Sequence, residues 1–337
     1  MSFEDIRTRF DGLFGKQRIW LHISLFAITF FTTTLAGVGW SGHEPLELEN
    51  FSYGIEYSVL LLLFLSAHEF GHFFAARYHN VDVTLPYYIP FPGAALGMMP
   101  NFGTFGAVIR TRSKLPSRKV IFDIGVAGPI AGFIVCLLLL IIGFITLPGI
   151  EYLQKIHPGY SYIPVSNGGS LIFGKTILYT FLEKMFAPST VYIPPMSEMY
   201  HYPLLCVGWF GLFVTSLNLL PVGQLDGGHT TYGLFPPRVH KIIGIITVTI
   251  LALLSIPELI LGFVPNSFYP NVAWLEPISI NGGSTWIFWV IMILVVIRFR
   301  HPTTLDESPL DTKRIFVGIL SLFIFIISFT PSPLFMR

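Results

Sequence analysis

The sequence predicts an all-α polytopic membrane protein with about seven transmembrane helices and a small membrane-associated β-hairpin or loop. Of the 337 residues, 53% are hydrophobic and only 12% are charged, about half the charged fraction of an ordinary soluble domain. Most of the apolar runs are long enough to cross a hydrocarbon core of about 30 Å as helices. The seven runs lie near 20–39, 55–76, 120–147, 203–221, 242–263, 284–299 and 315–331.

Basic residues alternate between the segments that connect these apolar runs. If the chain crossed a membrane at every run, sixteen of the twenty Lys and Arg residues would lie on one side. The other side would hold only Lys155, Lys175, Lys184 and Arg337. Because connecting segments rich in Lys and Arg stay in the cytoplasm, the pattern predicts a cytoplasmic N-terminus and an external C-terminus.

The sequence is predicted to form a single membrane-embedded domain over residues 1–337. Its two longer connections, 81–112 and 148–201, are both smaller than a typical independent domain. Cys136 and Cys206 lie within apolar runs, which predicts buried thiols rather than a disulfide or a thiolate metal site.

The connection 148–201 is predicted to be external and to carry an amphipathic helix from Ser170 to Phe186. Three charged residues, Lys175, Glu183 and Lys184, interrupt that helix. An eighth transmembrane span is the alternative. A segment of about 17 residues with three charges suits an interfacial helix better, and this assignment preserves the alternation of basic residues.

The connection 81–112 is apolar, yet its recurring prolines and glycines exclude a continuous helix. Within it, residues 103–110 predict a short strand whose glycines permit close backbone approach. Lipid cannot satisfy the amides of non-helical backbone, so this segment must lie against protein or a water-filled cavity. We expect a re-entrant β-hairpin or loop that borders the functional site, and a packed loop without an exposed strand is the alternative.

A five-residue motif, His68-Glu69-Phe70-Gly71-His72, lies inside the apolar run 55–76. Histidines four residues apart share one face of a helix, where two neutral imidazoles can bind the same zinc ion. Glu69 would take a proton from zinc-bound water that attacks a carbonyl and deliver it to the leaving amine. A chance match is the alternative, but each unpaired charge in a membrane helix costs about 2.5–3.5 kcal/mol, which favours a function.

A catalytic zinc site ordinarily takes a third protein ligand. The metzincin extension of the motif is excluded, because Ala75 and Tyr78 stand where that class has Gly and His. Asp226 is a candidate, because Pro221 and the neighbouring glycines would end a helix and turn the carboxylate inward. An ordinary interfacial turn explains Asp226 equally well, and Asn218 is as compatible with a hydrogen bond to a neighbouring helix.

The two motifs together, His68-Glu69-Phe70-Gly71-His72 and the N-x-x-P-x-x-x-L-D-G sequence that begins at Asn218, resemble the site-2 protease family. This family, peptidase family M50, consists of intramembrane zinc metalloproteases. The likeness covers about residues 50–310. It is most similar to the bacterial and plastid EGY-type branch through the segments 103–107, 127–132 and 225–229, Arg300-His301-Pro302 and the final helix.

The resemblance implies one zinc ion per chain, bound by His68, His72 and Asp226, with Glu69 as general acid and base. It also implies that Asn218 holds the substrate or the developing oxyanion. Family members cleave transmembrane or membrane-proximal segments of other proteins, often releasing a regulatory fragment. The expected partners are therefore the lipid bilayer and a membrane-protein substrate, and the branch favours a bacterial cytoplasmic membrane. Many members carry a PDZ or CBS domain, and this sequence shows neither.

The predicted strand offers a way to hold the substrate. A substrate helix hides its peptide carbonyls in intrahelical hydrogen bonds, so the scissile region must first become extended. The strand could pair with that region by β-strand addition and satisfy amides that lipid would leave bare. The candidate substrate-binding residues are Gly103, Thr104, Phe105, Gly106 and Ala107.

Two other functions fit parts of the pattern. Polar residues on membrane helices could mark the path of a metal transporter, although the remaining runs offer hardly any acidic or His side chain beyond His22. A catalytically silent protein that binds membrane proteins would keep the fold without the chemistry, and the intact Glu69 argues against it. Phosphate-cradling and nucleic-acid motifs are absent from the sequence, so no nucleic-acid partner is expected.

Overall fold

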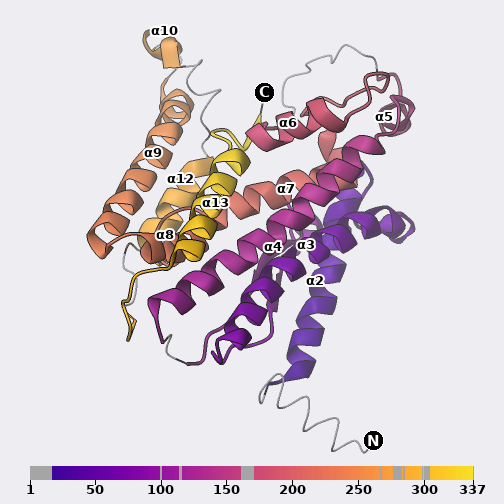
Figure 1. The fold of residues 1–337 in the computed structure, drawn as a ribbon. Coiled ribbons are helices and arrows are strands. Elements are labelled where there is room, and N and C mark those ends of the chain that lie inside the picture. Colours follow the sequence, from indigo (N-terminus) through magenta and orange to yellow (C-terminus); the bar gives the residue numbers. More distant parts are fainter. Residues whose placement is uncertain are drawn as a thin grey trace, which may run out of the picture.

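The computed structural model describes residues 17–98, 101–113, 116–160, 171–265, 268–275, 283, 285–297, 299 and 304–336. Helices make up most of this part of the chain and pack into a bundle (Figure 1). The predicted, mostly helical class is therefore confirmed. The Arg300-His301-Pro302 motif lies outside the described residues, as do several basic residues that entered the prediction of orientation.

Four helices in the described part of the chain are long and apolar enough to cross a membrane. They are α2 (Ile19–Trp40), α3 (Phe51–Tyr78), which continues the short helix η1 (Leu48–Asn50), α4 (Arg118–Ile145) and α9 (Pro237–Phe263). All four coincide with predicted apolar runs. The chain is accordingly a membrane protein.

Three further apolar helices are shorter than the roughly 20 residues that usually cross a bilayer. They are α7 (Pro203–Asn218), the helix made of α12 (Thr285–Met292) and the π-helical turn η5 (Ile293–Ile297), and α13 (Thr312–Ser328). The count of seven spans therefore stays a prediction.

Helix α3 occupies the centre of the bundle. It packs between α2 and α4, and these two contacts are the most extensive in the structure (Figure 1). Gly54 lets α2 approach the backbone of α3, because a Cβ atom there would collide with the carbonyl oxygen of Thr34. On its other side, α4 packs against α7 and α8 (Asp226–Leu234). Cys136 and Cys206 are free and buried in this core, as predicted.

The strand predicted within 81–112 is present as half of a hairpin. β1 (Tyr87–Pro90) and β2 (Thr104–Val108) pair antiparallel, with the short helix η2 (Ala94–Leu96) between them. β2 is shorter than the predicted 103–110. Gly103 has a φ of +74°, outside the extended region, and the backbone N–H of Arg110 leaves the ladder to donate to the hydroxyl of Thr84.

The connection 148–201 is only partly as predicted. Its elements are α5 (Glu151–Ile156), β3 (Leu171–Phe173), α6 (Ile177–Phe186) and η3 (Met199–His201). Toward the C-terminus, α9 is followed by α10 (Tyr269–Val272) and η4 (Ala273–Leu275), and the chain continues to the strand β4 (Leu334–Met336).

The amphipathic helix predicted from Ser170 is wrong in its first residues. Leu171 to Phe173 pair with β4 as a strand, and the helix starts after Thr176, whose hydroxyl accepts a hydrogen bond from the Tyr179 N–H. With 10 residues, α6 is too short to cross a bilayer. Its length therefore favours the predicted interfacial helix over an eighth span.

Candidate metal centre

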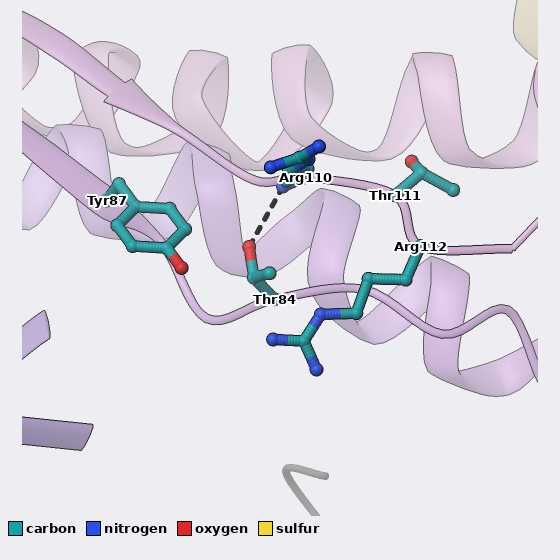
Figure 2. Close-up of a pocket in the computed structure, with 5 residues that line it drawn as sticks. All are labelled: Thr84, Tyr87, Arg110, Thr111 and Arg112. Carbon is teal, nitrogen blue, oxygen red and sulfur yellow. Dashed lines mark hydrogen bonds between the residues drawn. The ribbon is translucent and has the colours of Figure 1, made fainter. Parts of the chain in front are cut away.

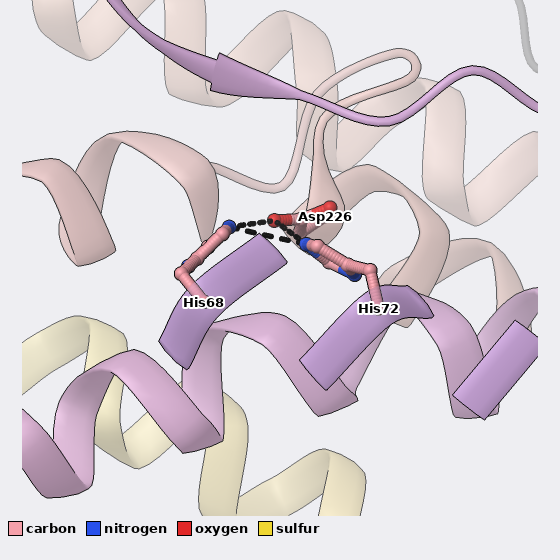
Figure 3. A group of neighbouring side chains, drawn as sticks. All are labelled: His68, His72 and Asp226. Carbon is pink, nitrogen blue, oxygen red and sulfur yellow. Dashed lines mark hydrogen bonds and ion pairs between the residues drawn. The ribbon is translucent and has the colours of Figure 1, made fainter. Parts of the chain in front are cut away.

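Three predicted ligands meet at one point in the bundle (Figure 3). The Nε2 atoms of His68 and His72 are 3.1 Å apart. Oδ2 of Asp226 lies 3.4 Å from Nε2 of His68 and 3.2 Å from Nε2 of His72. A carboxylate that belongs to α8 thus faces two imidazoles of α3, although 154 positions separate Asp226 from His72.

These separations suit a zinc ion. With bonds of about 2.0–2.1 Å, a tetrahedral zinc ion holds its ligand atoms about 3.3 Å apart. Two imidazole nitrogens and one carboxylate oxygen are a common catalytic zinc set, and they leave a fourth position for water or substrate. The three side chains therefore fit a single ion.

The His72 ring is oriented from behind by α4. Nδ1 of His72 lies 2.7 Å from the backbone carbonyl oxygen of Ile124, to which it donates. A hydrogen bond at Nδ1 fixes the tautomer and leaves the lone pair of Nε2 for a metal. A backbone acceptor has no side-chain signature, so the role of Ile124 could not be predicted from its residue type.

Glycines on α4 make room for the histidine face of α3. A Cβ atom at Gly128 would overlap the ring of His72, and one at Gly132 would lie 3.3 Å from Cβ and Nδ1 of His68. From the opposite side, a Cβ atom at Gly71 would lie 2.6 Å from the carbonyl oxygen of Ala127. The segment 127–132, which entered the prediction only through the family resemblance, therefore has a steric role.

The turn after α7 places Asp226. Helix α7 ends at Asn218, and Pro221 and Gly223, with a φ of +56°, carry the chain around to α8, which begins at Asp226. The turn is tight, because a Cβ atom at Gly227 would overlap the carbonyl of Leu219. The structure thus contains the helix break and the inward turn that were predicted from Pro221 and the neighbouring glycines.

Asn218 and Glu69 border the three ligands. Nδ2 of Asn218 lies 3.3 Å from Nε2 of His68, so its amide reaches the metal face of that ring. Glu69 is buried, with 7% of its surface exposed, and its carboxylate lies near the backbone N–H of Ile109. Ile109 directly follows β2, so the hairpin reaches the proposed acid and base.

The five candidate substrate-binding residues differ in how far they are hydrogen-bonded within the protein or exposed. Gly103 and Thr104 already make hydrogen bonds within the protein. The Thr32 hydroxyl donates to the Gly103 carbonyl at 2.7 Å, and the Thr104 hydroxyl donates to the Ile89 carbonyl at 2.7 Å. Phe105 is 70% exposed.

A Cβ atom added at Gly106 would meet no other atom within 4 Å. Ala107 pairs with Tyr88 of β1, whose hydroxyl lies 2.7 Å from Oγ of Ser66 on α3. In the described part of the chain, β2 pairs with β1 alone. Its second edge therefore pairs with no strand among the described residues.

A polar pocket adjoins the end of the hairpin (Figure 2). It has a volume of about 290 Å³ and is lined by Thr84, Tyr87, Arg110, Thr111 and Arg112. The two guanidinium groups give it a positive character. It lies one residue beyond Ile109, the residue whose N–H contacts Glu69.

Comparison with known proteins shows the family to which this chain belongs. Residues 56–256 match the profile of peptidase family M50. The probable zinc metalloprotease EGY1, chloroplastic, of Oryza sativa subsp. japonica is 28% identical over 287 residues, which cover 82% of this chain and 40% of the relative. The probable zinc metalloprotease EGY2, chloroplastic, of Oryza sativa subsp. indica is 24% identical over 311 residues, or 91% and 48% of the two chains.

A shorter match has the higher identity. The probable zinc metalloprotease EGY1, chloroplastic, of Arabidopsis thaliana is 32% identical over 200 residues, which cover 59% of this chain and 32% of the relative. The chain thus spans less than half the length of these relatives. No solved structure matches.

The site has the side chains of a zinc metalloprotease, and one of its helices is long and apolar enough to cross a membrane. The chain belongs to peptidase family M50, because the family match covers more than half of its length. The named relatives confirm the EGY-type branch, and their names describe them as probable zinc metalloproteases.

We expect Gly128→Ala to weaken zinc binding at His68 and His72. The added methyl group would displace the His72 ring from its hydrogen bond to Ile124, and loss of such supporting contacts typically costs about 10–100-fold in metal affinity. Zinc retention against a graded chelator measures the effect. Gly262→Ala is the matched control, because a Cβ atom there meets nothing within 4 Å; wild-type retention by Gly128→Ala would contradict the packing role.

Proposed function

We propose that this protein is an intramembrane zinc metalloprotease that hydrolyses peptide bonds in or near transmembrane segments of other membrane proteins. The observation that carries the proposal is the convergence of His68, His72 and Asp226 beside Glu69 on a helix long and apolar enough to span a bilayer. Membership of peptidase family M50 supports the same activity.

In the proposed site, His68, His72 and Asp226 hold the zinc ion. When bound there, zinc supplies a Lewis acid that lowers the pKa of a water molecule to about 7 and polarises a carbonyl oxygen. Glu69 takes the proton of the attacking water and passes it to the leaving amine. The backbone N–H of Ile109 lies near the Glu69 carboxylate and could orient it for both transfers.

Asn218 is placed to act on the substrate. Its amide borders the metal face of His68, where a side-chain N–H could stabilise the oxygen of a carbonyl under attack. We therefore propose that Asn218 binds the substrate carbonyl or the developing oxyanion. The burial of His68, Glu69 and His72 strengthens every such electrostatic interaction, because little water screens it.

We propose that the open edge of β2 binds the unwound substrate. Phe105 and Val108 are exposed on this strand, and an added strand would find backbone partners that lipid does not offer. Because β2 leads directly to Ile109 and Glu69, a paired substrate would be guided toward the zinc ligands. The pocket at Arg110 and Arg112 could bind an anionic lipid head group or an acidic juxtamembrane segment, although retention of these arginines on one side of the membrane explains them more simply.

We propose seven spans, with α7, the α12–η5 helix and α13 crossing as short helices, and an N-terminus on the cytoplasmic side and a C-terminus on the external side. A bacterial cytoplasmic membrane was expected from the sequence, whereas the names of the relatives place those proteins in the chloroplast.

We expect Glu69→Gln to abolish proteolysis without changing zinc content. The amide is nearly isosteric but cannot accept the proton, and loss of a general acid–base group typically costs about 10²–10⁴-fold in rate. The measurement is cleavage of candidate membrane substrates by purified protein in liposomes, with zinc quantified in the same samples. Zinc uptake into the liposomes that persists in Glu69→Gln, without cleavage by the wild type, would favour a transporter and reject the proposal.

We expect Ala107→Pro to reduce cleavage while zinc content stays at the wild-type level. Proline removes a backbone donor from β2 and restricts its φ angle. Ala107→Val is the matched control, because it keeps the N–H and favours a strand. Equal turnover by the proline and valine variants would count against substrate pairing at this strand.

A further inference from the structure

A second group of metal-binding side chains lies in the connection 148–201. His157 follows α5, and Glu198 and His201 belong to the turn of η3. The Nε2 atoms of His157 and His201 are 3.0 Å apart. Oε2 of Glu198 lies 3.5 Å from Nε2 of His157 and 3.6 Å from Nε2 of His201.

This geometry repeats that of the first site. There, two imidazole nitrogens lie 3.1 Å apart and a carboxylate oxygen lies 3.2–3.4 Å from each. Both groups consist of two histidines and one carboxylate, and both are close to the separation of about 3.3 Å set by a tetrahedral zinc ion. By residue type and by the distances between ligand atoms, the second group is as suitable for zinc as the first.

His201 is prepared to bind a metal through Nε2. Its Nδ1 lies 2.6 Å from the carbonyl oxygen of Trp40, to which it donates, so the neutral ring carries its lone pair on Nε2. The backbone carbonyl of His201 accepts a hydrogen bond of 2.7 Å from the Tyr152 hydroxyl. The ring is 97% buried by these and other contacts, with 3% of the side chain exposed.

A hydrogen-bond network alone does not explain this group. His157 could donate from Nε2 to Nε2 of His201, which would satisfy both rings. Oε2 of Glu198 would still have no donor, since it is buried and makes no hydrogen bond within the described residues. A buried carboxylate oxygen without a partner is costly, and a divalent cation between the three side chains would satisfy it.

The group is separate from the first site. Trp40 is the last residue of α2. It lies about one helical turn beyond Gly37, which packs against Gly54 of α3. His68 lies fourteen residues further along α3, which corresponds to ~21 Å at 1.5 Å per residue. One ion could not serve both groups.

We propose that His157, Glu198 and His201 form a second zinc site that fastens the connection 148–201 to the end of α2. Three protein ligands leave the fourth position to water. His157 provides the route of entry, because 45% of its side chain is exposed. Through His201 and its bond to the Trp40 carbonyl, the ion ties α5, η3 and α2 together.

Zinc stoichiometry tests this proposal and needs no substrate. The purified full-length protein, dialysed against metal-free buffer after loading with zinc, is expected to retain about two ions per chain. His157→Ala and Glu198→Gln should each lower the count to about one, and so should His72→Ala. The double variant His72→Ala/His157→Ala should retain essentially none.

His43→Ala is the matched control, because His43 belongs to the same end of the protein but not to the three-residue group; it should keep the wild-type count. His157 is half exposed and Gln is isosteric with Glu, so circular dichroism should show both folded. One ion per chain in the wild type, or an unchanged count in both His157→Ala and Glu198→Gln, would overturn the proposal. Neither result depends on proteolysis, so the proposed activity stands or falls separately.

Discussion

The contact between the histidine face of α3 and the glycine face of α4 supports the rest of the site. Two imidazoles on one turn of a membrane helix need space, and His72 also needs an acceptor for its second nitrogen. Gly128 and Gly132 leave the space, and the Ile124 carbonyl is the acceptor. Because both come from the same face of α4, the packing of two helices also sets the orientation of the ligands.

The same helix connects the metal ligands to the hairpin. Glu69 lies near the backbone N–H of Ile109, and Ser66, one turn earlier on α3, contacts Tyr88 of β1. Non-helical backbone in an apolar bundle is stable only where protein satisfies its polar groups. Here α2 and α3 do so for the hairpin, and they leave one edge of β2 unpaired among the described residues.

The two histidine and carboxylate groups are built by different routes. The first takes both histidines from one helix and recruits its carboxylate from a turn far along the chain. The second gathers its residues from short elements of one connection and relies on the carbonyl of Trp40, in a separate helix, to orient its buried ring. In each group a backbone carbonyl fixes the tautomer of one histidine, which is the supporting contact that metal-binding imidazoles commonly need.

Local residue patterns were enough to predict the helical membrane class, the zinc motif on α3 and the break that precedes Asp226. These follow from hydropathy, from the four-residue spacing of His68 and His72, and from Pro221 and its glycines, all of which act locally. The residues alone made Asp226 a candidate ligand but left an ordinary turn equally possible. The resemblance to a known family favoured the ligand, and it alone pointed to the segment 127–132. The start of α6 was misplaced, because the pairing of β3 with β4 joins residues about 160 positions apart and leaves no local pattern.

The meeting of groups that are distant in the chain depends on how the helices and connections pack. The Ile124 and Trp40 carbonyls and the Ile109 N–H are backbone groups that every residue carries, so no residue type announces them. The proximity of His157, Glu198 and His201 likewise depends on how α5 and η3 pack against the end of α2. Composition and periodicity describe one element at a time, whereas metal ligands and their supporting contacts are defined by the distances between elements.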